Sequence, residues 1–114
     1  MTPNYTYAAS VKQVVDGDTI DLTIDLGLRV LLSARIRLMG IDTPEVSTEK
    51  GRQVRDIVRS LLPAYTPVLV STFKNPEDKY GRWLGVITMQ DKTVLNDLLV
   101  REGHAVAYDG GKKA

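Results

Sequence analysis

Residues 19–26 read TIDLTIDL, and this stretch indicates the fold class more clearly than any other. Its apolar residues fall on every second position, and threonine or aspartate stands between them. Strict alternation of this kind predicts a β-strand with one buried side and one solvent-facing side. The positions that should face the core are Ile20, Leu22, Ile24 and Leu26.

The sequence on either side of this stretch predicts two neighbouring strands. Before it, an alternating run begins at Val11 and is broken by Asp16-Gly17, a dipeptide typical of hairpin turns. After it, Gly27 allows a second reversal, and residues 28–39 form a third strand. One face of that strand should consist of Val30, Leu32, Ala34, Ile36 and Leu38. Its other face carries Arg29, Leu31, Ser33, Arg35 and Arg37.

Two helices are predicted further along the chain. Apolar residues recur at helical spacing from Val54 to Leu62, and Pro63 ends that pattern. A second helix is indicated by a leucine-rich stretch, in which Thr93 is positioned as the N-cap and Gly103 as the stop. The leucines that define this second pattern are Leu95, Leu98 and Leu99.

The order of these elements predicts the fold. Residues 68–73 and 84–89 read as two more strands, joined by a polar segment. Three strands, a helix, two strands and a helix make an α+β, mainly β, protein, and the pattern suits a five-stranded OB-type barrel. A chain of 114 residues with 43% hydrophobic content supports one domain over residues 1–114, in which residues 109–114 should form a flexible tail.

Composition limits the function classes without selecting one. The formal net charge is +1, whereas proteins that contact many phosphates are usually more basic, so composition alone does not indicate nucleic acid. The chain has no cysteine, so disulfides do not stabilise the fold. It has no apolar run of membrane-spanning length and no signal-peptide pattern, so we expect no membrane partner.

Residues 42–45, Asp-Thr-Pro-Glu, are the first candidate functional motif. They bring two carboxylates and a hydroxyl group together directly after a predicted strand, and Arg37 lies five residues upstream. An Asp or Thr followed three residues later by Glu is also the signature of a helix capping box. The convincing helical periodicity starts only near Val54, however, so a helix capped at this motif would begin with two unpatterned turns.

Two other segments add polar groups to this motif. Residues 16–19, Asp-Gly-Asp-Thr, are in isolation mostly a turn, yet a carboxylate at a turn can also face a cation. Residues 78–82, Asp-Lys-Tyr-Gly-Arg, read either as a charged surface loop or as a loop whose arginine enters a pocket. Oxygen ligands for a hard cation, together with arginines for phosphate oxygens, indicate metal-assisted phosphodiester hydrolysis.

These residues in this order closely resemble the staphylococcal nuclease, or thermonuclease, family, from Val11 to Tyr108. The resemblance implies the same OB barrel and a calcium-dependent endonuclease. It further implies DNA and RNA as substrates, little sequence preference and products with 3′-phosphates. The segment from Val46 to Gly51 is short where family members often carry a longer loop. The alternative is a non-catalytic OB module that binds nucleic acid or protein, and we expect a monomer.

The resemblance also assigns roles to residues. The Ca²⁺ ligands it implies are Asp18, Asp42 and the backbone carbonyl of Thr43. The implied catalytic residues are Arg37, Glu45 and Arg82. Glu45 would orient or deprotonate the attacking water, and the two arginines would stabilise charge on the phosphate. Strand periodicity does not choose between Arg35 and Arg37, but the family spacing selects Arg37. The implied substrate-binding residues are Lys79, Tyr80 and Tyr108, and His104 receives no catalytic role.

Overall fold

The computed structural model describes residues 5–73 and 83–108. Its helices and strands are β1 (Tyr5–Asp16), β2 (Thr19–Asp25), β3 (Leu31–Leu38), β4 (Ile41–Asp42), α1 (Glu49–Leu61), β5 (Pro67–Phe73), β6 (Trp83–Thr88), α2 (Leu95–Arg101) and β7 (Val106–Ala107). The five predicted strands and both predicted helices are present in the predicted order. The sequence did not predict β4 and β7, because two residues are too few to show a periodic pattern.

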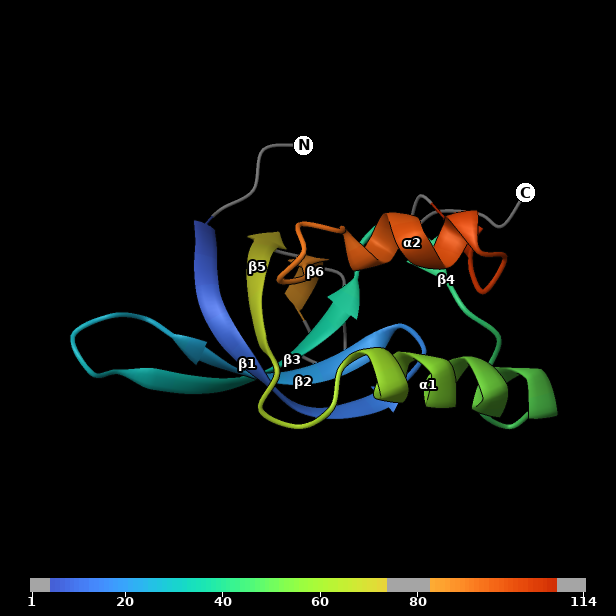
Figure 1. Cartoon of the computed structure of the whole chain (residues 1–114), viewed down its shortest axis with the longest axis horizontal. Coiled ribbons are helices and arrows are strands. Elements are labelled where there is room, and N and C mark those ends of the chain that lie inside the picture. Colours follow the sequence, from blue (N-terminus) through green and yellow to red (C-terminus); the bar gives the residue numbers. More distant parts are fainter. Residues whose placement is uncertain (1–4, 74–82, 109–114) are drawn as a thin grey trace.

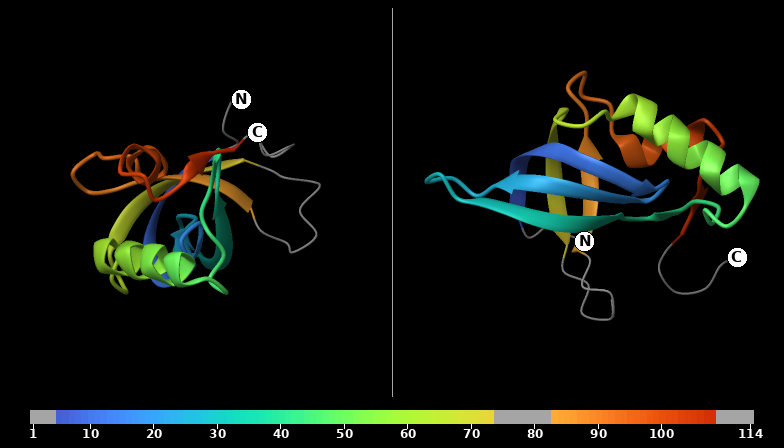
Figure 2. Two further views of the ribbon diagram at one scale, coloured as in Figure 1. Left: turned by 90° about the vertical axis from the view of Figure 1, so that its right-hand side faces the viewer. Right: turned by 90° about the horizontal axis from the view of Figure 1, so that it is seen from below.

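Strands β1, β2, β3, β6 and β5 form a closed barrel in that order, which confirms the predicted five-stranded OB-type fold (Figure 1). The pairs within the barrel are antiparallel, except that β3 and β6 run parallel. β4 and β7 pair separately as a small antiparallel ribbon. Both helices lie toward one end of the barrel, and the β2–β3 hairpin projects from the other end (Figures 1 and 2).

Most of the barrel core consists of alternating residues that the sequence predicts. Ile20, Leu22 and Ile36 are fully buried, and α1 closes one side of the core with Val54 and Val58. The described helices include none that is both long enough and apolar enough to cross a membrane.

Three of the predicted core residues are exposed. Leu26 is 43% exposed, Val30 51% and Leu32 48%, because the β2–β3 hairpin extends beyond the barrel, where the described chain lays no strand across its apolar side. The predicted third strand is also too long at its start. Leu28 and Arg29 have positive φ angles and form the turn of the hairpin.

Both helix starts differ from the expectation, and both stops agree with it. α1 begins at Glu49, and its N-cap is Thr48, whose hydroxyl oxygen accepts a hydrogen bond from the backbone N–H of Gly51 at 3.0 Å. Residues 42–45 therefore do not cap this helix. The N-cap of α2 is Val94 rather than Thr93. Gly103, with φ +78°, ends α2 as predicted.

Candidate active site

Three strand ends bring the candidate residues together at the end of the barrel near the helices. Asp18 lies in the turn between β1 and β2, Arg37 near the end of β3, and Asp42 at the end of β4. The backbone N–H of Leu38 donates to the carbonyl of Asp18 at 2.8 Å, which fixes the β1–β2 turn against the last residue of β3.

The guanidinium group of Arg37 lies between the two aspartates. Its Nη1 is 3.3 Å from Oδ2 of Asp18, and its Nη2 donates to Oδ1 of Asp42 at 3.2 Å. Nη1 also donates to the carbonyl of Leu38 at 3.0 Å. Side chains this well shielded, at 15% exposure for Arg37, interact more strongly than surface pairs. The planar guanidinium therefore holds both carboxylates in one fixed arrangement.

Arg35 lies on the same face of β3 but in a different environment. Its Nε and Nη2 donate to the two carboxylate oxygens of Asp21, its cross-strand neighbour, at 2.7 and 3.1 Å. Hydrogen bonds from Arg35 lower the pKa of Asp21 below its ordinary value, against a smaller effect of burial. The side chain of Arg35 is 49% exposed and that of Asp21 is 13% exposed, so this pair reaches solvent through Arg35 and is separate from the cluster around Arg37.

Asp18 is 8% exposed and accepts several hydrogen bonds. Its Oδ2 accepts from the backbone N–H of Thr43 at 3.2 Å, and its Oδ1 accepts from the Thr19 hydroxyl at 3.3 Å. Burial alone would raise the pKa of Asp18, but its hydrogen bond with Asp16, the charge of Arg37 and the N–H of Thr43 together lower it. Asp18 is thereby kept ionised.

The pKa of Asp16 is shifted in the opposite direction. Burial, together with the hydrogen bond and the negative charge of Asp18, raises the pKa of Asp16 to about 6. Two carboxylates this close repel each other when both are charged, so the turn between β1 and β2 is a place where added positive charge is favourable.

Two glycines allow residues 43–45 to approach the rest of the site. The sequence analysis identified Gly17 only as a turn residue and gave Gly51 no role. A Cβ atom at Gly17 would lie 2.9 Å from the Thr43 hydroxyl, and a Cβ atom at Gly51 would overlap the backbone carbonyl of Glu45. The Thr48 hydroxyl donates to that same carbonyl at 2.6 Å. The backbone of Glu45 is thus fixed against the first turn of α1, while the residue remains exposed.

Asn96 is another residue that the sequence did not single out. It is 4% exposed on α2, and its Nδ2 donates to the carbonyls of Met39 at 2.8 Å and Gly85 at 3.1 Å. Its Oδ1 accepts from the backbone N–H of Ile87 at 3.2 Å. Asn96 therefore ties α2 to β6 and to the segment that leads into β4. Helical periodicity could have placed this buried amide on the inner face, beside Leu95 and Leu99.

A hollow of about 300 Å³ adjoins the carboxylate cluster. The motif at residues 42–45 forms one wall, and Lys50 and His104 are among the other residues that line it. Tyr108 follows β7, where its backbone N–H donates to the carbonyl of Gly40 at 2.8 Å, and it does not line this hollow. Lys79, Tyr80 and Arg82 lie outside the described residues.

The donor atoms suit a hard cation better than a soft metal. Asp18 and Asp42 offer carboxylate oxygens on the two sides of one guanidinium, and Thr43 adds a backbone carbonyl directly after Asp42. Ca²⁺ is bound by oxygen ligands of this kind at variable geometry. Within residues 5–73 and 83–108, no group of three or more His, Cys, Asp and Glu side chains could hold a metal. Two carboxylates and one carbonyl are fewer than the six to eight oxygen ligands that Ca²⁺ takes, so a cation held by them would have open positions for water and substrate.

The comparison with known sequences identifies the family. Residues 35–114 match the family described as "Staphylococcal nuclease homologue". The chain belongs to the staphylococcal nuclease family. The matched segment includes Arg37 and the motif at residues 42–45, whereas Asp18 precedes it. The structure joins Asp18 to the family segment through the Arg37 ion pair and the hydrogen bond from Thr43.

Several curated proteins are similar to this chain in sequence. A protein of Escherichia coli O157:H7 named as an uncharacterized endonuclease is 37% identical over 99 residues, covering 87% of this chain and 60% of that protein. A thermonuclease of Staphylococcus intermedius is 33% identical over 85% of this chain and 57% of its own length. A micrococcal nuclease of Shigella flexneri is 30% identical over 90% of this chain and 59% of its own length. The chain thus spans about three-fifths of each of these relatives.

Proposed function

We propose that this chain is a calcium-dependent endonuclease that hydrolyses phosphodiester bonds in DNA and RNA. The observation that carries this proposal is the Arg37 guanidinium between Asp18 and Asp42, at 3.3 and 3.2 Å. Carboxylates beside a shielded guanidinium provide a cation-binding and an anion-binding group at one place. A phosphodiester that is being cleaved needs both.

The cation would be held by Asp18, Asp42 and the backbone carbonyl of Thr43. Bound there, Ca²⁺ supplies Lewis-acid polarisation of a phosphate oxygen. The buried position of Asp18 and its lowered pKa support this assignment, because a metal-ligating carboxylate must be deprotonated. Asp16 adds negative charge to the same turn without being required as a ligand.

Glu45 would orient or deprotonate the attacking water. Its backbone is fixed by Thr48 and by the close approach of Gly51, so an exposed carboxylate is presented from a rigid segment. General-base catalysis of this type is worth about 10²–10⁴-fold in rate. Glu45 also lines the hollow beside Asp42, where a bound phosphodiester could lie next to the cation.

Arg37 would stabilise the negative charge that develops on the phosphoryl oxygens. To do so, its Nη atoms would exchange part of their contact with the two aspartates for the substrate, and Asp18 and Asp42 would then hold the cation. Arg82 is proposed as the second cation at the phosphate, and Lys79, Tyr80 and Tyr108 as nucleotide-binding residues. These four assignments rest on the family motif. Little sequence preference and 3′-phosphate products are proposed on the same basis.

Digestion of supercoiled plasmid and of a structureless RNA tests the proposal. Wild-type protein should cleave both with Ca²⁺ and neither with chelator, and Asp42→Asn should be far less active at equal Ca²⁺. End-group analysis should find 3′-phosphates. Cleavage that is undiminished in chelator, or binding of nucleic acid without cleavage under every condition, would overturn the proposal, and the latter result would identify a binding module.

A further inference from the structure

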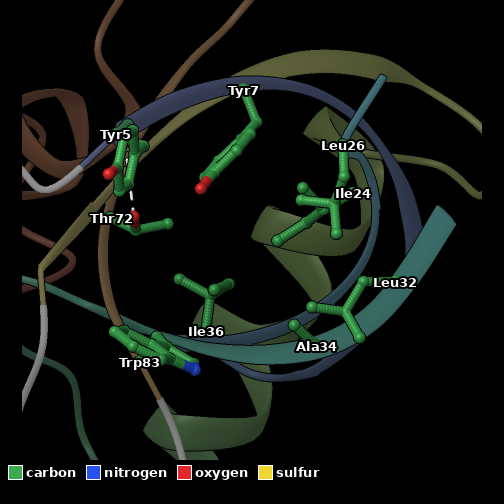
Figure 3. A pocket seen from close by; sticks show the side chains of 9 residues that line it. All are labelled: Tyr5, Tyr7, Ile24, Leu26, Leu32, Ala34, Ile36, Thr72 and Trp83. Atoms are coloured by element: carbon green, nitrogen blue, oxygen red, sulfur yellow. Dashed lines mark hydrogen bonds between the residues drawn. The ribbon is translucent and has the colours of Figure 1, made fainter. Parts of the chain in front are cut away.

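The end of the barrel opposite the candidate active site has a cavity that the proposed chemistry does not use. We call it the mouth pocket. It measures about 250 Å³, and Figure 3 shows aromatic and aliphatic side chains directed into it from around the barrel. Its lining includes Tyr5, Tyr7, Leu26, Leu32 and Trp83. The site end is therefore charged, and the mouth pocket is largely apolar.

The β2–β3 hairpin projects beside this pocket, and we call residues 26–32 the arm (Figures 1 and 2). Leu28 at its tip is 98% exposed, and Val30 is 51% exposed. Leu26 and Leu32 at its base line the mouth pocket and are 43% and 48% exposed. The arm thus places an apolar knob at a fixed distance from an apolar cavity of the same molecule.

The backbone at the tip is unfavourable for the residues that occupy it. Leu28 has φ 54° and Arg29 has φ 65°, and the N–H of Val30 donates to the carbonyl of Gly27 across the turn. A turn with two consecutive positive φ angles favours Asn and Gly, whereas a bulky leucine is a conformational outlier there. Strain of this kind, which presents one exposed leucine, indicates that the side chain has a role that the isolated chain does not show.

The exposed apolar area matches what an interface needs. Leu26, Leu28, Val30, Leu32, Tyr5 and Trp83 together expose roughly 600 Å², which is at the upper end for the largest apolar patch of a monomer. If two copies buried this patch against each other, they would remove about 1,200 Å² from water, which reaches the lower limit of stable protein interfaces.

We propose that the arm and the mouth pocket form a homodimer interface, in which Leu28 of each protomer inserts into the mouth pocket of its partner. Knob and pocket lie at opposite ends of the same arm. If the two arms lie antiparallel and a two-fold axis passes through their midpoints, Leu28 of each protomer therefore meets the mouth pocket of its partner. Such an arrangement is closed and self-complementary, as most homodimers are. It differs from the monomer that the sequence analysis expects.

The charges around the pocket favour protein over nucleic acid as the occupant. Among residues 26–32 and the described residues that line the mouth pocket, Arg29 is the one charged side chain. A nucleic-acid surface neutralises several phosphates with Lys and Arg, and the described residues of the arm and the mouth pocket offer only Arg29 for this. An apolar patch of this size instead calls for another apolar surface, and the arm itself supplies one.

Dimerisation through this interface would leave the described carboxylate cluster around Asp18 open. β2 runs from Thr19, beside Asp18, to Asp25, at the base of the arm, and its seven residues span about 20 Å. The inference therefore does not depend on the proposed nuclease activity. A monomeric protein that cleaves DNA would contradict only the dimer, and an inactive dimer would contradict only the nuclease.

Sedimentation velocity over a wide concentration range tests the dimer with a matched pair of variants. Leu28→Asn removes the knob but suits the positive φ of the turn, so it should fold at least as well as wild type. Leu31→Asn changes an equally apolar residue of the same arm that pairs with Asp25 on its opposite face. Wild type and Leu31→Asn should dimerise, and Leu28→Asn should raise the dimer dissociation constant at least about tenfold, because each dimer loses two buried knobs.

Disulfide trapping tests the geometry, because the natural chain has no cysteine to interfere. An equimolar mixture of Leu28→Cys and Tyr5→Cys chains should form a mixed disulfide-linked dimer under mild oxidation. Leu28→Cys chains alone should crosslink far less, because the two Leu28 tips lie at opposite ends of the paired arms. A monomeric mass for wild type at every concentration, or equal dimerisation of the Leu28→Asn and Leu31→Asn variants, would overturn the proposal.

Discussion

The two ends of the barrel differ in how their unusual side chains are stabilised. At the site end, Asp18 and Arg37 are shielded from solvent, and they contact each other and several backbone groups. At the mouth end, Leu28 is almost fully exposed, and the aromatic and aliphatic residues around the pocket leave a cavity. The site end is thus preorganised within one chain, whereas the mouth end is completed only by a further apolar surface.

A second comparison, between two arginines of β3, shows how strongly the contacts of a residue decide its role. Arg37 and Arg35 lie two residues apart on β3, yet Arg37 contacts Asp18 and Asp42, whereas Arg35 contacts Asp21. Strand periodicity does not distinguish these arginines, because both occupy the same face of the strand. Their contacts show that chemistry at the site end depends on which carboxylates each one meets.

The largest expected effect comes from replacing Arg37, with the same replacement of Arg35 as the matched control. Arg37→Lys keeps the charge but loses the planar fork that contacts both aspartates, so kcat for plasmid cleavage should fall by about 10²–10³-fold. Arg35→Lys should change kcat little. Single-turnover cleavage with Ca²⁺, with circular dichroism to confirm folding, measures both. Equal losses in the two variants would show that the cluster around Arg37 is not the catalytic centre.

Calcium binding should distinguish the two ends next. At a hundredfold excess of Ca²⁺ over its dissociation constant, mass action predicts that the free energy of unfolding rises by about 2.7 kcal/mol. Asp18→Asn and Asp42→Asn should lose most of this gain, because each removes a carboxylate from the site end. Thermal melts with Ca²⁺ and with chelator provide the measurement.

Asp25→Asn serves as the control for these melts, since Asp25 lies at the base of the arm and its carboxylate accepts from the backbone N–H of Gly27. It should retain the full gain from Ca²⁺. If saturating Ca²⁺ leaves the wild-type midpoint unchanged, the cation site proposed here is absent.

Gly51→Ala should have an intermediate effect. The added Cβ overlaps the carbonyl of Glu45, so either α1 or the segment at residues 43–45 must move. Overpacking of this kind costs on the order of 1–3 kcal/mol of stability, and it should also lower kcat by displacing Glu45. Denaturant unfolding and kinetics below the midpoint measure the two effects. Gln53→Ala, on the exposed side of the same helix, is the matched control and should leave both values near wild type.

The smallest expected effect concerns the pair of Asp21 and Arg35. Because hydrogen bonds from Arg35 lower the pKa of Asp21 from its ordinary value of 3.8, ionised Asp21 stabilises the fold above that value. This contribution should disappear as the pH falls through the lowered pKa. The stability difference between wild type and Asp21→Asn should therefore be small and constant from neutral pH to about pH 5, and then shrink in stronger acid. A difference that grows on acidification would contradict this assignment.

The sequence predicted the barrel well where a residue's neighbours along the chain determine its environment. The alternation in residues 19–26 correctly identified β2, and Asp16-Gly17 correctly identified its turn, because both features are local. The periodicity from Val54 to Leu62 identified α1 but not its first turn, since the residues from Glu49 to Gln53 lack an apolar stripe. A local sequence pattern does not predict where a helix begins when its first turn is set by contact with a distant loop.

The site and the arm show where local patterns end. Two-residue strands such as β4 and β7 are defined by their pairing with each other, which becomes visible only in three dimensions. The need for glycine at position 51 arises from Glu45 across a chain reversal. Likewise, Val30 and Leu32 have the spacing of core residues, but the hairpin carries them past the end of the barrel. Periodicity indicates which face a residue occupies, not whether that face is covered.

The central claim is that Asp18, from the β1–β2 turn, and Asp42, from β4, act in one calcium-dependent site. The most direct test measures Ca²⁺-dependent plasmid cleavage by wild type, Asp18→Asn, Asp42→Asn and the double variant. Residues that act as a unit give non-additive losses of activity. The double variant should therefore be only slightly less active than the less active of the two single variants. If the two losses instead multiply in the double variant, the aspartates act independently, and the single site built around Arg37 is contradicted.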